Sequence, residues 1–78
     1  MKYCSLKDFF VLIRVGFHGG ANALPYTVLD VLDLARIKGY NLTQEKALKY
    51  LERLIQKGWV CQKGDLYINP LWVYQGGI

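Results

Sequence analysis

Apolar residues recur every three or four positions in three stretches of the chain, which is the spacing that gathers them on one side of a helix. The stretches are 5–16, 27–39 and 43–58. Each opens with a serine or threonine that can cap the first turn, and each closes on a glycine or just before one. In the first two, an aspartate follows the cap by three residues and completes a capping-box pattern. The pattern predicts three helices.

The first predicted helix is apolar almost all round, although its aromatic and β-branched residues would also suit a strand. A helix without a polar side must be covered on more than one side, either by its own domain or by a second copy of the chain. We therefore expect a homodimer. The apolar residues expected at its interface are Leu6, Phe9, Phe10 and Ile13.

Residues 18–26 read as a glycine-containing loop whose end, Leu24 to Tyr26, can pair as a very short strand. After the third helix, residues 59–62 and 66–69 read as two strands around the turn Lys63-Gly64-Asp65. With 78 residues, the chain is expected to form one domain, residues 1–78. The predicted fold class is α+β, with three helices and a C-terminal β-hairpin.

The second and third helices are separated by a turn of three or four residues that begins with Gly39. Two residues can cap the third helix, Thr43 or Asn41, and the pattern leaves both open. Either choice joins two helices by a short glycine-containing turn. This is the helix-turn-helix arrangement.

Positive charge is concentrated in the second half of the chain. Residues 1–35 contain three basic and three acidic side chains, whereas residues 36–63 contain seven basic side chains and two acidic ones. The whole chain carries a formal charge of +4. A localised positive field favours an anionic partner such as nucleic acid.

The third predicted helix sorts its charges by sign. At about 100° per residue its apolar face consists of Ala47, Leu48, Leu51, Leu54 and Ile55. The bases Lys46, Lys49, Arg53 and Lys57 lie opposite or beside that face with Tyr50 among them, and the acids Glu45 and Glu52 lie together on its edge. One interpretation is a solvated face with a Glu45–Lys49 pair, and the other is a surface that meets a polyanion.

The order of elements, together with the stretch "LERLIQKGWV", resembles the winged-helix (winged helix-turn-helix) family of DNA-binding domains. The ending "LYINPLWVYQG" is similar to the second wing strand of small plasmid-borne members, and the compact chain suggests the regulators carried by archaeal viruses and plasmids. The resemblance implies a helix-turn-helix over about residues 27–57 and a wing over about 59–70. It also implies that the third helix enters the major groove of double-stranded DNA.

The resemblance implies a division of roles among the DNA-binding candidates. Near the start of the third helix, Gln44, Glu45 and Lys46 would meet base edges, while Lys49, Tyr50 and Arg53 would contact phosphates. Gln62 and Lys63 at the wing would touch the backbone or minor groove. The expected function is a sequence-specific transcriptional regulator or copy-control protein, and the alternative is a winged-helix module that binds another protein.

Other functions are not favoured. The acids share no repeated spacing and no nucleophile stands beside a base, so we expect no enzyme. Two cysteines and one histidine are too few for a zinc site, and no cofactor or metal is expected. No stretch approaches the roughly 20 apolar residues of a membrane span or resembles a secretory signal. We therefore expect a cytoplasmic protein with reduced cysteines.

Overall fold

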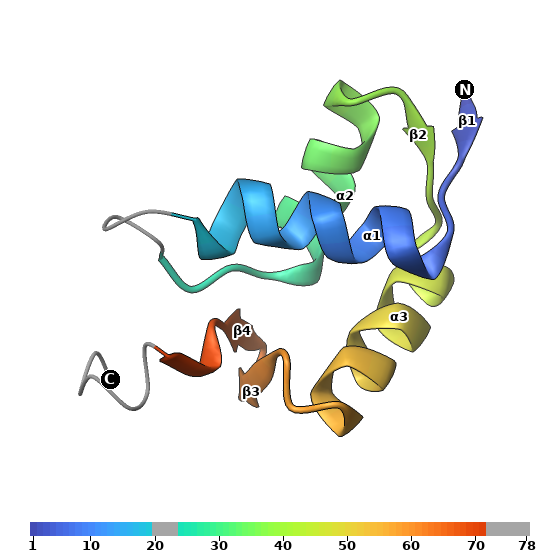
Figure 1. Ribbon diagram of the computed structural model, residues 1–78. Helices are drawn as coiled ribbons and strands as arrows, with labels where there is room; N and C mark the ends of the chain where they lie inside the picture. The colour runs from blue at the N-terminus through green and yellow to red at the C-terminus, as the bar shows by residue number, and fades with distance from the viewer. Residues whose placement is uncertain (20–23, 72–78) are drawn as a thin grey trace.

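The structure is a computed structural model that describes residues 1–19 and 24–71, so residues 20–23 of the predicted loop and 72–78 of the predicted domain lie outside it. Three α-helices dominate the fold (Figure 1): α1 (Leu6–Ile13), α2 (Val28–Ile37) and α3 (Gln44–Gln56). A hairpin of β3 (Cys61–Lys63) and β4 (Leu66–Ile68) follows α3. The predicted α+β class is confirmed, and the arrangement is compatible with a winged helix.

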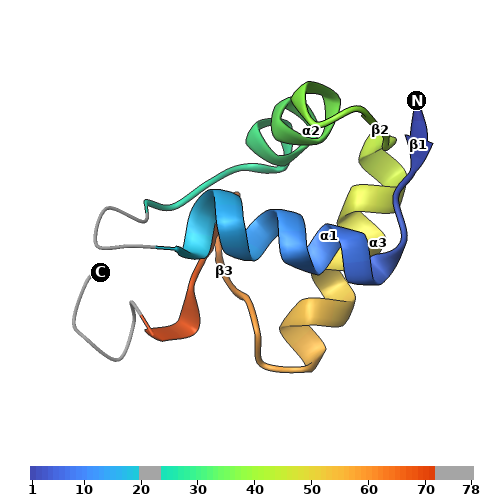
Figure 2. The same ribbon diagram turned by 45° about the horizontal axis from the view of Figure 1, so that its top comes forward.

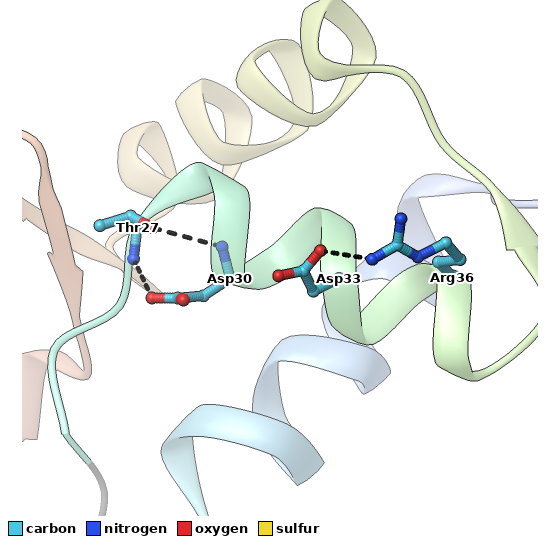
Figure 3. Close-up of polar contacts among 4 residues, drawn as sticks. All are labelled: Thr27, Asp30, Asp33 and Arg36. Atoms are coloured by element: carbon cyan, nitrogen blue, oxygen red, sulfur yellow. Dashed lines mark hydrogen bonds and ion pairs between the residues drawn. The ribbon is translucent and has the colours of Figure 1, made fainter.

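Side-chain caps define where the helices begin. The Ser5 hydroxyl accepts the backbone N–H of Asp8 at 3.1 Å, and the Asp8 carboxylate accepts the backbone N–H of Ser5 at 3.2 Å. Thr27 and Asp30 form the same capping box on α2, at 3.2 and 2.9 Å (Figure 3). On α3 the Thr43 hydroxyl accepts the backbone N–H of Lys46 at 3.2 Å, so the cap is Thr43 rather than Asn41.

The first helix continues further than its sequence pattern predicts. Instead of stopping at Gly16, α1 passes into a π-helical turn that spans Arg14–His18. The backbone of Gly16 lies directly against the side chain of Leu34 on α2, where even a single added methyl group would collide. The absence of a side chain at Gly16 therefore lets the two helices cross closely.

A single hydrophobic core is shared by the three helices and the hairpin. Its buried members are Cys4, Phe9, Leu12, Ile13, Tyr26, Val31, Ala35, Ala47, Leu51, Leu54, Val60 and Tyr67. Ile68 on β4 is buried as well. Leu48, predicted to face the core, is instead 41% exposed, because it lies at the border of the apolar face of α3. Both cysteines are free thiols, and burial raises the pKa of Cys4.

The predicted dimer surface is wrong for two of its four residues. Phe9 and Ile13 are fully buried in the core of their own chain, so they are not available to a second copy. Leu6 and Phe10 are half-buried against the same core, and Phe10 stacks on Trp59 with ring centroids 4.6 Å apart. The exposed side of this first helical segment presents Val11 and Val15 instead.

The two wing strands are shorter than predicted, and β4 pairs with a residue before α2, a partner that the sequence did not identify. The backbone N–H of Trp59 donates a hydrogen bond of 2.9 Å to the Leu54 carbonyl at the end of α3. Trp59 therefore belongs to the helix end, and the first strand begins at Cys61 instead of residue 59. Gly64, with φ of +62°, begins the turn that connects the two strands. Tyr26 bridges to Tyr67 on β4 through two backbone hydrogen bonds of 2.9 and 2.7 Å. Of the very short strand predicted over residues 24–26, only this isolated bridge at Tyr26 is formed.

Two short strands have no counterpart among the predicted elements. Residues Lys2–Tyr3 form β1, which pairs in parallel with β2 (Tyr40–Asn41) in the turn between α2 and α3. Both views show β1 and β2 side by side near the start of α3 (Figures 1 and 2). The chain's first residues therefore lie beside the helix-turn-helix. Within residues 1–19 and 24–71, the helices are too short to cross a bilayer.

Candidate nucleic-acid interface

The third helix turns its apolar side inward and its bases outward. Ala47, Leu51 and Leu54 are completely buried, while Lys49 and Arg53 on the other side are exposed. Lys46 is half-buried. We call Lys46, Lys49 and Arg53 the basic face.

Carboxylates do not neutralise the basic face. In the described part of the chain the only ion pair joins Arg36 to Asp33 at 2.8 Å, and both residues belong to α2 (Figure 3). The Glu45–Lys49 pair that would mark an ordinary solvated helix is not formed. The cations of the basic face therefore keep a positive potential that is available to an anion.

The basic face forms one wall of a groove of about 470 Å³. The groove is lined by Tyr3, Leu6, Thr43, Glu45, Lys46, Lys49, Tyr50 and Arg53. Five of the predicted DNA-binding residues are thus brought to one concave surface, although they span nine positions of the sequence. A groove of this kind concentrates the field of its charges more than a flat surface does.

Tyr3 on β1 meets Lys46 across the groove. The Lys46 ammonium lies 4.0 Å from the centroid of the Tyr3 ring and 5.8 Å from that of Tyr50, which is the geometry of a cation–π contact. Its contact with Tyr3 raises the pKa of Lys46, so Lys46 remains a cation. The neighbouring Tyr50 hydroxyl, followed by the Lys46 ammonium, lowers the pKa of Tyr3.

Tyr50 contacts both the groove and the hydrophobic core. Its hydroxyl donates a hydrogen bond of 2.9 Å to the Cys4 carbonyl, and its ring packs on Phe9 at a centroid distance of 5.2 Å. Burial, followed by the contact with Tyr3, raises the pKa of Tyr50. Tyr50 therefore holds the end of β1 against α3 in addition to lining the groove.

Three predicted site residues do not line the groove. Gln44 is exposed at the start of α3, and Lys63 is exposed at the end of β3. Gln62 lines a separate hollow of about 490 Å³ together with Glu52 and Leu48, and its amide donates to the Gly64 carbonyl at 3.1 Å. Gln62 and the basic face therefore lie on different flanks of α3.

The sequence pattern gave no indication that Tyr3 belongs to this surface. A two-residue strand has too few positions to show an alternating pattern, and its partner lies in a turn far along the chain.

No protein-family model, curated protein or solved structure matches this chain.

Proposed function

We propose that this protein is a sequence-specific double-stranded DNA-binding protein that acts inside the cell as a small transcriptional regulator or copy-control protein, not as an enzyme. In this proposal α3 enters the major groove and the wing lies over the adjacent backbone or minor groove. Its origin in an archaeal virus or plasmid is part of the same proposal. The one observation that carries it is the basic face on the second helix of the helix-turn-helix, whose cations form no ion pair with a carboxylate among residues 1–19 and 24–71.

The basic face keeps like charges close together. Lys49 and Arg53 lie one turn apart on the same face, and like-charged neighbours at this spacing destabilise a helix slightly. Phosphates that flank the DNA groove would neutralise both charges and release the counterions condensed on the duplex. The basic face is therefore better matched to a polyanion than to water alone.

Sequence preference is assigned to the exposed start of α3. Gln44 can pair with adenine and Glu45 can accept from cytosine, and neither side chain has a hydrogen-bond partner among the described residues. Lys49 and Arg53, further along the helix, act on phosphates of any sequence.

Binding of labelled duplexes to the protein across a range of salt concentrations tests the proposal. We expect Lys49→Ala and Arg53→Ala each to weaken binding to every sequence and to reduce the slope of log K against log salt by about 0.9. Gln44→Ala should instead relax preference at one base position. If the intact protein retards no duplex even at about 50 mM salt, the proposal is wrong.

A homodimer would place two α3 helices in half-sites about one duplex turn apart. Because Phe9 and Ile13 are buried, its contact would have to use the exposed side of the first helical segment, where Val11 and Val15 lie. Light scattering that finds a monomer at high protein concentration would exclude this part of the proposal and leave DNA binding intact.

The alternative function is a module that binds another protein. It is favoured by a hollow of about 380 Å³, in which Val11, Val15 and Leu34 form an apolar surface. The charged residues Lys2, Asp8 and Lys38 line the same hollow. Failure to bind duplex DNA, together with loss of a protein partner in Val15→Asp, would favour it.

A further inference from the structure

The beginning of the chain is fixed beside α3 by contacts on both sides of Tyr3. Before it, the backbone N–H of Lys2 donates to the Gly39 carbonyl at 2.8 Å, and Lys2 pairs with Tyr40 in the parallel sheet. After it, Cys4 is completely buried and its carbonyl accepts the hydrogen bond from Tyr50. The position of Tyr3 is therefore determined by its neighbours.

The Tyr3 side chain itself is not used by the core. It is 69% exposed, although aromatic rings of its size usually gain more by burial. Its ring covers the Lys46 ammonium at 4.0 Å and stands over the groove that Lys49 and Arg53 also line. Tyr3 thus combines a fixed backbone with an exposed side chain, as many residues that contact a ligand do.

The groove has the chemistry of a phosphate site. Its charged members are three cations and one acid, and Tyr3 adds a hydroxyl that can donate a hydrogen bond. The neighbouring Tyr50 hydroxyl, and next the Lys46 ammonium, lowers the pKa of this hydroxyl and so makes it a stronger donor. Charge-assisted hydrogen bonds of this kind to phosphate are stronger than those between neutral groups.

We propose that the groove between β1 and α3 binds the phosphodiester backbone of one DNA strand, with the Tyr3 hydroxyl donating to a phosphate oxygen beside Lys46, Lys49 and Arg53. The inference rests on the proposed DNA-binding function and assigns β1 to the interface. It also changes the role of Lys46. Because its ammonium is held over Tyr3 inside the groove, Lys46 contacts phosphate and does not read a base.

The test compares tyrosine variants on a 20-base-pair duplex of random sequence. Tyr3→Phe keeps the ring and its cation–π contact but removes the hydroxyl. We expect about threefold to tenfold weaker binding with an unchanged salt slope, because a neutral hydroxyl releases no counterion. Lys46→Gln should weaken binding to random DNA and reduce the salt slope by about 0.9.

Tyr40→Phe is the matched control, since Tyr40 pairs in the same small sheet but does not line the groove. It should bind as tightly as the unaltered protein. Equal affinities of the unaltered protein, Tyr3→Phe and Tyr40→Phe would overturn the inference while leaving DNA binding in place. A loss in Tyr3→Phe that is confined to one preferred sequence would also overturn it, because Tyr3 would then read a base. An unaltered protein that binds no duplex at all would remove the proposed function and this inference together.

Discussion

The two flanks of α3 differ in charge and in the element that packs beside them. On one flank, β1 and the basic face enclose a groove with three cations. On the other flank, the wing residue Gln62 shares a hollow with Glu52 and the exposed Leu48. The positive potential of α3 is therefore directed toward the beginning of the chain and away from the wing.

This difference shows that a helical wheel alone does not define a binding surface. The wheel separates bases from acids, but it does not say which neighbouring segment will lie beside each group. Here the basic residues lie beside a two-residue strand that brings an exposed tyrosine. The two acids, which the wheel places together, are separated: Glu45 lines the groove and Glu52 lies beside the wing. If the comparison is right, changes on the two flanks should affect DNA binding differently.

Reversal of two charges on the groove flank should have the largest effect. Lys49→Glu combined with Arg53→Glu replaces two phosphate contacts by two repulsions, and we expect duplex binding to fall at least about 100-fold near 100 mM salt. Fluorescence anisotropy with a labelled duplex measures this. The control, Lys7→Glu with Lys38→Glu, makes the same change in net charge elsewhere on the exposed surface. An equal loss in the control would mean that total charge matters and the flank does not.

Acid should destabilise the fold at a site remote from both flanks. Burial, and next the nearby Arg14, lowers the pKa of His18 from 6.5 to about 4, and its Nε2 lies 2.7 Å from the Tyr26 hydroxyl. The folded state therefore binds fewer protons than the unfolded state between these values. The resulting stability is present above pH 6.5 and is lost as pH falls toward 4, by about 1–2 kcal/mol after allowance for partial exposure.

Urea unfolding at several pH values, with His18→Gln as the comparison, measures this contribution. The variant should lose the part of the pH dependence that lies between 6.5 and 4. A variant with the same pH profile as the unaltered protein would contradict the assignment to His18.

Removal of the Tyr50 hydroxyl should weaken the attachment of β1 to α3 without changing the charge of the groove. Tyr50→Phe deletes the hydrogen bond to the Cys4 carbonyl, and we expect a loss of about 1 kcal/mol in the free energy of unfolding. Hydrogen exchange at the amides of residues 2–4 should accelerate at the same time. Unchanged exchange there would show that Tyr50 does not hold β1 in place.

Neutralising one acid on each flank should have the smallest effect on DNA affinity. Glu45 lines the groove and Glu52 lines the wing-side hollow. We expect Glu45→Gln to strengthen binding to random duplex about twofold, and Glu52→Gln to change it less, because screened interactions weaken with distance. The reverse order would place the phosphates on the wing side.

Local features of this fold could be predicted from the sequence. Ser5 with Asp8 and Thr27 with Asp30 predicted two helix starts, because caps depend on residues three positions apart. The glycines at 39 and 58 have positive φ, as expected where helices end. The basic face was also visible, since it follows from the helical period.

Features that depend on contacts between residues far apart in the sequence could not be predicted. The burial of Phe9 and Ile13 requires knowledge of what packs on α1, and an all-round apolar helix is equally consistent with a dimer. The pairing of Tyr3 with Asn41 joins segments 38 residues apart through backbone groups, which carry no sequence signal. For this reason the groove could not be predicted, although five of its residues were.

The most direct test of the central claim is a titration of isotope-labelled protein with a 20-base-pair duplex, followed by amide chemical shifts. We expect the largest changes at residues 2–3 and 43–53, with smaller changes along the wing and none at Val11 and Val15. Changes concentrated on the exposed side of α1, with α3 and β1 unaffected, would contradict the claim that the basic face meets the phosphates.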